Sequence, residues 1–438
     1  MKNAYIASIK QFLIGTEVEV LGWITAKRCH SSVFFLDIHD STGTLQVVFE
    51  KEHDSSLYCK AKKFHAEAAV KITGKVQLGR NQCVEIKAEE ITLIGDTTLS
   101  IDPHPRDRTI DIFDESLTSH LLDYRHLYLR NPKVMAILKF RDFIMHEMRG
   151  WFYENGFTSV DTPILTPVPL YEDKSALSVN VHGQDVFMTQ CAGYYLEAAV
   201  HAFEKVYNMG PSFRNEESRS KRHLMEYWHI KAEMAWDDLE GVIATVERVI
   251  QFLTQRSSER AQDMLKVLGT SLCIDGLKIP FPRISYDDAI TLLVKNGMDI
   301  SYGKSLGSVE EEALSKHFTG PFWITGIPRT IEPFPYVIDQ TNPKVTRVAD
   351  LIASNGYGEL LGVAEKIHSI EMLDERMTEK DRRDDPRFNF VREVHQMGCV
   401  PHVAFGMGLE RLIRWLLNVP HVRDAIPFPR IFKRSINP

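Results

Sequence analysis

The segment 213–236 (FRNEESRSKRHLMEYWHIKAEMAW) combines a cation, an acid and an aromatic ring around a charged loop. We expect Arg214 and Glu216 on a strand before the loop and Tyr227 on a second strand after it. An arginine fork binds phosphate oxygens through paired, charge-assisted hydrogen bonds. A tyrosine ring offers a stacking face to a base. These residue types are the ones that a site for a nucleoside triphosphate needs.

A second arginine comes from the glycine-rich segment 402–417 (HVAFGMGLERLIRWLL), which is typical of a strand running into a helix. Gly406 and Gly408 would let a flat base or a ribose lie close to the backbone. Arg411 falls in the first turn of the helix. Because two arginines on separate elements can neutralise charge that builds up in a transition state, Arg214 and Arg411 are the predicted catalytic pair.

Two acidic residues on further predicted strands complete this group. Asp350 in RVADLI and Glu359 in GYGELLG offer carboxylate oxygens, which Mg²⁺ prefers when it bridges nucleotide phosphates. Taken singly, each residue is better explained as part of a buried ion pair or a solvated charged loop. Their joint occurrence favours a site for ATP and Mg²⁺.

The N-terminal part of the chain predicts a separate small domain. Residues 16–95 form five short segments of alternating apolar and polar residues, with a helical insert around 59–69. Five strands and one helix fit a Greek-key barrel of the OB type, which often binds single-stranded nucleic acid. Another small β-domain is the alternative. We expect this domain to cover residues 1–100.

The remainder of the chain predicts a hinge and a larger domain. The proline-rich and charged stretch DPHPRDR indicates a linker over residues 101–130. A long amphipathic helix then ends near Gly156, and strands and helices are mixed from there onward, without a Walker-type loop. We therefore expect an α+β domain over residues 131–438, with an antiparallel sheet flanked by helices. Pro163, expected inside a strand of GFTSVDTPILTP, marks a sheet edge or an interface.

Composition excludes several classes of protein. The 438 residues carry a net charge of -7, which argues against a generic basic nucleic-acid binder. The N-terminus lacks the apolar core of a signal peptide, and no apolar run is long enough to span a bilayer. A cytoplasmic protein without a membrane partner is therefore expected. None of the six cysteines lies at C-x-x-C spacing, so neither a zinc knuckle nor a disulfide framework is indicated.

Taken together and in this order, the segments around Pro163, Arg214 and Arg411 resemble the three signature motifs of class II aminoacyl-tRNA synthetases. The barrel, the hinge, RHLYLRNP at 125–132 and RDAIPFPR at 423–430 resemble subclass IIb, and the asparaginyl and aspartyl enzymes match best. The resemblance implies a ligase that activates asparagine or a related amino acid or carboxylate as an acyl adenylate and transfers it to tRNA. It also implies a homodimer with Pro163 at the interface.

The resemblance assigns a role to each residue of the ATP half of the site. Arg214 would contact the α-phosphate, and Arg411 would lie beside the γ-phosphate. The other implied ligands are Glu216 for the adenine amino group, Arg222 and His223 for the outer phosphates, Tyr227 for stacking on adenine, Gly408 beside the nucleotide, and Asp350 and Glu359 for Mg²⁺. All these positions hold the expected residue type, so the ATP half is predicted to be complete.

The amino-acid half departs from the family pattern. In CAGYYLE, Gly193 stands where a glutamine is usual, and Glu197 matches the glutamate that reads the side-chain amide in asparaginyl enzymes. Leu196 stands where aspartyl enzymes have a lysine, which favours the asparaginyl branch. Lys366 replaces an arginine, so a point charge replaces a fork that can grip a carboxylate.

Lys231 is the largest departure, because it occupies the position of the acid that accepts the substrate's α-ammonium. Two like charges at 4 Å repel by roughly 4 kcal/mol when the effective dielectric constant is near 20. We therefore expect a substrate that lacks a free α-ammonium in the usual place or carries an extra acidic group that Lys231 meets.

The barrel retains Phe35 at the position of the aromatic that stacks on an anticodon base. Ser31, Ser32 and His39 replace glycine, lysine and arginine, which removes phosphate contacts. A tRNA is the expected partner, but two alternatives stay open. One is a paralogue that acts as a tRNA-independent amide or ester ligase on a different carboxylate. The other is a catalytically silent RNA-binding or regulatory descendant, against which the complete ATP constellation weighs.

Overall fold

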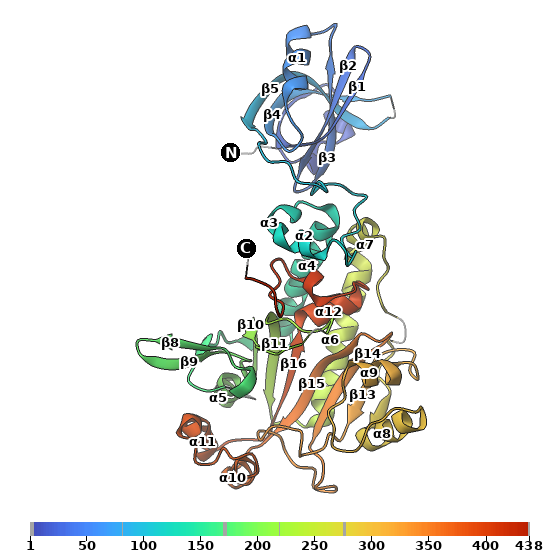
Figure 1. Cartoon of the computed structure of the whole chain (residues 1–438). Helices are drawn as coiled ribbons and strands as arrows, with labels where there is room; N and C mark the ends of the chain where they lie inside the picture. Colours follow the sequence, from blue (N-terminus) through green and yellow to red (C-terminus); the bar gives the residue numbers. More distant parts are fainter. Residues whose placement is uncertain (1–3, 81, 170–172, 219, 275–276, 437–438) are drawn as a thin grey trace. The chain divides into compact units, whose positions relative to one another are not determined.

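The chain folds into two compact units, Met1–Asp107 and Arg108–Pro438, in a computed structural model (Figure 1). The structure describes residues 4–80, 82–169, 173–218, 220–274 and 277–436. Among these residues, no helix has both the length and the apolar character needed to cross a membrane.

The first unit is a closed five-stranded barrel with strand order β1-β2-β3-β5-β4, which confirms the predicted OB-type fold. Its elements are β1 (Glu17–His30), β2 (Val33–Asp40), β3 (Gly43–Glu50), α1 (Ser55–Lys63), β4 (Ala69–Leu78) and β5 (Val84–Gly95). Along β2 the side chains of Phe34, Leu36 and Ile38 enter the core, and Phe35 between them is only partly buried. The helix lies earlier than expected because the Asp54 side chain caps its first turn by accepting a hydrogen bond from the Leu57 N–H.

The second unit is built on an eight-stranded sheet with order β12-β13-β14-β15-β16-β11-β10-β6. The neighbours are antiparallel except at the two edges, where β12 pairs with β13 and β6 pairs with β10 in parallel. The strands of this sheet are β6 (Thr158–Ser159), β10 (Lys205–Phe213), β11 (Glu226–Ala235), β12 (Arg283–Ser285), β13 (Phe322–Thr325), β14 (Val348–Ala353), β15 (Gly358–Lys366) and β16 (His402–Gly408). The sheet confirms the predicted α+β class.

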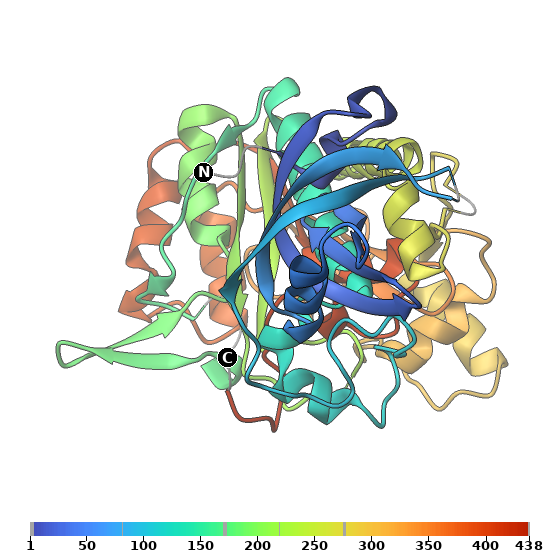
Figure 2. The ribbon, with the colours of Figure 1, turned by 90° about the horizontal axis from the view of Figure 1, so that it is seen from above.

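The second unit also contains helices, some of which pack against this sheet (Figures 1 and 2). They are α2 (Thr118–Asp123), α3 (Arg125–Tyr128), α4 (Pro132–Glu154), α5 (Gly193–Phe203), α6 (Leu239–Arg260), α7 (Gln262–Leu268), α8 (Tyr286–Lys295), α9 (Ser308–Ser315), α10 (Ile370–Glu379), α11 (Asn389–Gln396) and α12 (Leu409–Leu416). The Phe152 ring of α4 stacks on Tyr207 of β10 with ring centroids 4.2 Å apart. Such contacts fix the strands that carry the site.

The segment expected as a linker differs from that expectation. Residues 108–130 belong to the second unit and contain α2 and α3. Arg125 is buried, and its Nε donates a hydrogen bond to the Pro427 carbonyl at 2.8 Å, with Nη2 donating to the Ile426 carbonyl at 3.0 Å. Because these bonds join residues 302 and 301 positions apart, the local composition of the segment did not indicate them.

The strand expected around Pro163 is interrupted. β6 ends at Ser159, β7 (Leu165–Thr166) belongs to a separate three-stranded sheet, and Pro163 lies between them. β8 (Ser178–Val181) and β9 (Gln184–Met188) complete that small sheet, and their hairpin projects from the unit in both views (Figures 1 and 2). Proline lacks the N–H that a continuing strand would need, which agrees with the break.

Candidate active site

A cavity of about 590 Å³ lies over the central strands of the large sheet. Tyr227, His229 and Lys231 line it from alternate positions of β11, because every second side chain of a strand points to the same face. In register with Lys231 lie Gly406 of β16 and Gly362 of β15. The two glycines leave a flat floor, and a Cβ at position 406 would come within 2.8 Å of His229 Nε2.

Arg214 enters the cavity from just beyond β10, not from the strand itself as expected. Its Nη1 lies 3.4 Å from Glu216 Oε1, and its guanidinium carbon is 5.9 Å from the centre of the Tyr227 ring. Glu216 likewise follows the strand, and His223 precedes β11. The chain leaves the sheet here, so these polar and charged side chains lie at the strand ends beside the cavity.

Arg411 meets this group from the first turn of α12. Its Nη1 lies 3.1 Å from Glu359 Oε2 and donates to the Glu359 carbonyl at 3.2 Å. Arg222 lies on the same side of the cavity and forms an ion pair with Glu311 of α9. Arg411 and Arg222 both lower the pKa of Glu359 although burial opposes its charge. Arginines are thus held by acids around one end of the cavity.

The two histidines of the cavity are neutral at physiological pH. Burial and the nearby Arg411 lower the pKa of His223 to about 4. Burial and Lys231 lower the pKa of His229 well below its usual value. Both rings therefore act as hydrogen-bonding groups, not as cations.

Four carboxylates gather beside the arginines. Burial, followed by Glu359, raises the pKa of Asp350 well above its usual value. Burial likewise raises the pKa of Glu311 and of Glu332 to about 7, with Glu359 adding to both. Asp350, Glu332 and Glu359 line the cavity itself. Since mutual repulsion resists ionisation of such a group, a bound cation would relieve it.

The other end of the cavity is lined by Lys231, Tyr336, Ala364 and Ala404. Lys231 is only 6% exposed, and its Nζ lies 3.4 Å from Cys191 Sγ. Burial opposes its charge, but Cys191, Tyr336 and Glu233 keep the pKa of Lys231 raised. This end of the cavity therefore presents a cation.

Three predicted substrate ligands lie elsewhere. The described residues that line the cavity do not include Gly193, Glu197 or Lys366, all of which are buried. The Glu197 carboxylate pairs with Lys366 Nζ at 2.9 Å and with His395 Nε2 at 3.3 Å. Burial opposes this charge, yet Lys366 lowers the pKa of Glu197 to about 2. Two opposite charges buried together pair with each other, and this pair lies outside the described cavity lining.

Some cavity residues were missed by sequence reasoning. His229 was available from the alternation of β11, since it lies between Tyr227 and Lys231 on the same face. Glu332 of the cavity lining, and Glu311, which pairs with the lining residue Arg222, carry no local signal, because they come from a loop and a helix far along the chain.

A nucleotide-sized cavity on an antiparallel sheet, with arginines from two elements and a separate OB barrel, defines the class II aminoacyl-tRNA synthetase architecture. The family model for class II tRNA synthetases (D, K and N) matches residues 118–431, and that for the OB-fold nucleic acid binding domain matches residues 18–94. The chain therefore belongs to the class II tRNA synthetases of the D, K and N group, ligases that form an aminoacyl adenylate.

Relatives and solved structures refine the comparison. The chain is 34% identical to an asparagine–tRNA ligase of Thermococcus gammatolerans, covering 98% of both chains. It is also 34% identical to an asparagine–tRNA ligase of Desulforamulus reducens, covering 96% of both. The crystal structure of asparaginyl-tRNA synthetase from Pyrococcus horikoshii complexed with asparaginyl-adenylate superposes with a TM-score of 0.91 at 32% identity, covering 99% of both chains.

Proposed function

We propose that the protein activates asparagine, or a closely related amino acid or carboxylate, with ATP and transfers the acyl group to tRNA. The observation that carries this proposal is the cavity itself, in which Arg214, Arg411 and Tyr227 lie together at one end and Lys231 at the other. The similarity to asparagine–tRNA ligases over 98% of the chain supports the choice of asparagine. All six cysteines are free thiols, in keeping with a reaction in the reducing cytoplasm.

In the proposed reaction the substrate carboxylate attacks the α-phosphorus of ATP, and pyrophosphate leaves. The tRNA hydroxyl then attacks the acyl carbon, and AMP leaves. Arg214 would stabilise the α-phosphate and Arg411 the outer phosphates, with Arg222 and His223 beside them. Glu216 would bind the adenine amino group, Tyr227 would stack on the ring, and Gly408 lets the nucleotide approach. These steps need positioning and charge stabilisation, not a protein nucleophile.

Asp350 and Glu359 would hold Mg²⁺, with Glu332 beside them. The raised pKa of Asp350 among its acidic neighbours fits such an ion, because a cation offsets the repulsion. When bound, Mg²⁺ supplies charge neutralisation for the phosphates.

Phe35 of the barrel would stack on a base of the tRNA. We expect Phe35→Ala to raise the KM for tRNA in asparagine charging by roughly 5- to 150-fold, because one base stack contributes about 1–3 kcal/mol. ATP–pyrophosphate exchange should not change, since the barrel does not contribute to the described cavity lining. Phe12→Ala is the matched control, because this phenylalanine of the same unit is 80% exposed.

Charging and exchange together test the proposed function. A panel of amino acids and related acids in pyrophosphate exchange identifies the carboxylate, and charging of tRNA tests the acceptor. Exchange with some acid but no charging of any tRNA would favour a tRNA-independent amide or ester ligase.

We further propose a two-fold homodimer formed through the segment around Pro163. Ile164 and Leu165 beside it are 43% and 47% exposed, and Tyr153 at the end of α4 is 82% exposed, so apolar surface gathers near β6 and β7. Light scattering at micromolar concentration should give twice the chain mass, and Ile164→Asp should give a monomer. Ile94→Asp, which changes an isoleucine of the barrel with 62% exposure, should leave the dimer intact. A monomeric wild type would contradict the proposal.

A further inference from the structure

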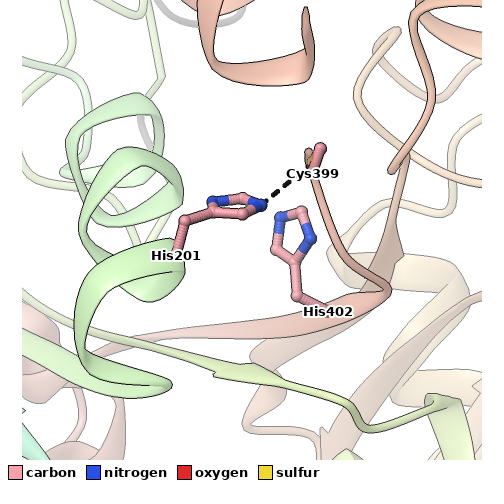
Figure 3. A group of neighbouring side chains, drawn as sticks. All are labelled: His201, Cys399 and His402. Carbon is pink, nitrogen blue, oxygen red and sulfur yellow. Dashed lines mark hydrogen bonds between the residues drawn. The ribbon is translucent and has the colours of Figure 1, made fainter. Parts of the chain in front are cut away.

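A second group of chemically active side chains lies outside the described cavity lining and takes no part in the proposed reaction. His201 on α5, Cys399 in the loop before β16 and His402 at the start of β16 each offer one atom, and these three atoms lie within 4.8 Å of one another (Figure 3). The His201 Nε2 to Cys399 Sγ distance is 3.1 Å. The rings of His201 and His402 are 5.4 Å apart at an interplanar angle of 72°.

The backbone selects the tautomer of both histidines. His201 Nδ1 is 2.6 Å from the Glu197 carbonyl, and His402 Nδ1 is 2.8 Å from the Val400 carbonyl. A carbonyl oxygen only accepts, so each Nδ1 carries the proton and donates. Each Nε2 then keeps its lone pair, and a carbonyl behind the ring is how metal-binding histidines are oriented in proteins.

Buried polar atoms at this place lack partners. His402 is fully buried, and its Nε2 has no hydrogen-bond partner among the described residues. Glu233 is also fully buried, and neither carboxyl oxygen accepts a hydrogen bond from a described residue; its Oε2 lies 4.0 Å from His402 Nε2. Buried polar groups without hydrogen-bond partners are rare in folded proteins, and a bound ion is one of the few explanations for them.

We propose that His201 Nε2, Cys399 Sγ and His402 Nε2 bind one Zn²⁺ ion, with the Glu233 carboxylate as the nearest further oxygen ligand. One sulfur, two imidazoles and a carboxylate are a ligand set that suits Zn²⁺ and disfavours Mg²⁺. Cys399 loses its thiol proton to solvent when the metal–sulfur bond forms. The Val400 N–H, which donates to His201 Nε2 at 3.2 Å, would give up this bond to the metal.

The ion would tie the end of α5 to the start of β16. The Glu197 that pairs with Lys366 lies one turn before His201 on the same helix. The Zn²⁺ site would thereby fix the helix that carries Glu197 of the Glu197–Lys366 pair, and it is a positioning site rather than a catalytic one.

The test uses the full chain, stripped by a chelator and titrated with Co²⁺ and then Zn²⁺. We expect one Co²⁺ per chain with tetrahedral visible bands and a sulfur-to-cobalt charge-transfer band, both displaced by Zn²⁺. The Asp350 and Glu359 site offers only oxygen, so it cannot produce the sulfur band. Cys399→Ser should abolish that band and weaken Zn²⁺ binding by more than about 100-fold. Even the loss of a group that only hydrogen-bonds to a metal ligand lowers metal affinity by roughly 10- to 100-fold.

Two further variants control for folding and for unrelated thiols. Cys273→Ser changes a buried cysteine of the same unit, whose Sγ lies 3.6 Å from Ser354 Oγ, and should keep the full band. His201→Gln, at a partly exposed position, should weaken binding while circular dichroism stays unchanged. A wild type without the sulfur band, or a band that survives in Cys399→Ser, would overturn the proposal.

Discussion

Arg214→Ala and Arg411→Ala should each reduce ATP–pyrophosphate exchange by roughly 10²- to 10³-fold or more, because each removes a preorganised charge partner of the transition state. Arg214 is held 3.4 Å from Glu216 and Arg411 3.1 Å from Glu359, so both guanidinium groups are already positioned beside the cavity. The loss should appear mainly in kcat, because each arginine would contact the phosphates most strongly in the transition state.

Arg283→Ala is the matched control for both arginines. Arg283 forms a surface ion pair with Glu240 at 2.7 Å and does not belong to the described cavity lining, so exchange should be unchanged. Circular dichroism and melting temperature should show that all three variants remain folded. Near-normal exchange in Arg214→Ala or Arg411→Ala would refute the proposed ATP site.

Lys231 should make plain asparagine a weak substrate. An ammonium group at the acyl end of the cavity would face a buried cation and lose a charge-assisted hydrogen bond, which costs about 1.5–3 kcal/mol. This corresponds to roughly a 10- to 150-fold loss in kcat/KM. We therefore expect Lys231→Glu, alone or with Gly193→Gln, to restore part of the exchange with asparagine. An acid with an anionic or oxygen-accepting group in place of the ammonium should be used best by the wild type.

The structure favours Lys231→Glu alone over its combination with Gly193→Gln as the test. Gly193 is buried at the start of α5 behind the cavity, so Lys231→Glu alone should carry most of the recovery. Lys316→Glu, a charge reversal at a residue whose side chain is 71% exposed, controls for the change in net charge. The KM for ATP should stay constant in Lys231→Glu and in Lys316→Glu. Efficient charging of tRNA with asparagine by the wild type would show that Lys231 does not exclude an ammonium.

The amino-acid sequence by itself determined the elements that follow a local period. The alternation of β2 predicted a barrel strand, whereas Phe35 and the grouping of Arg214, Tyr227 and Arg411 were predicted from the resemblance of the motifs to the family. The strands and helices can be predicted in this way because the period of a strand or helix is set by neighbours along the chain. The same locality explains the small errors, since the ends of β10 and α1 depend on caps and contacts beyond the pattern.

Only the tertiary structure decided which charged groups meet. Glu197 and Lys366 had been expected to contact the substrate, and in the structure they pair with each other at 2.9 Å outside the described cavity lining. Glu311 and Glu332 join the carboxylates around Asp350 from distant segments. His201 and Cys399 lie 198 positions apart, and strand register with helix packing brings them to 3.1 Å. Such pairings depend on the long-range packing of the whole unit, because a buried charge or lone pair finds its partner in space and not along the chain.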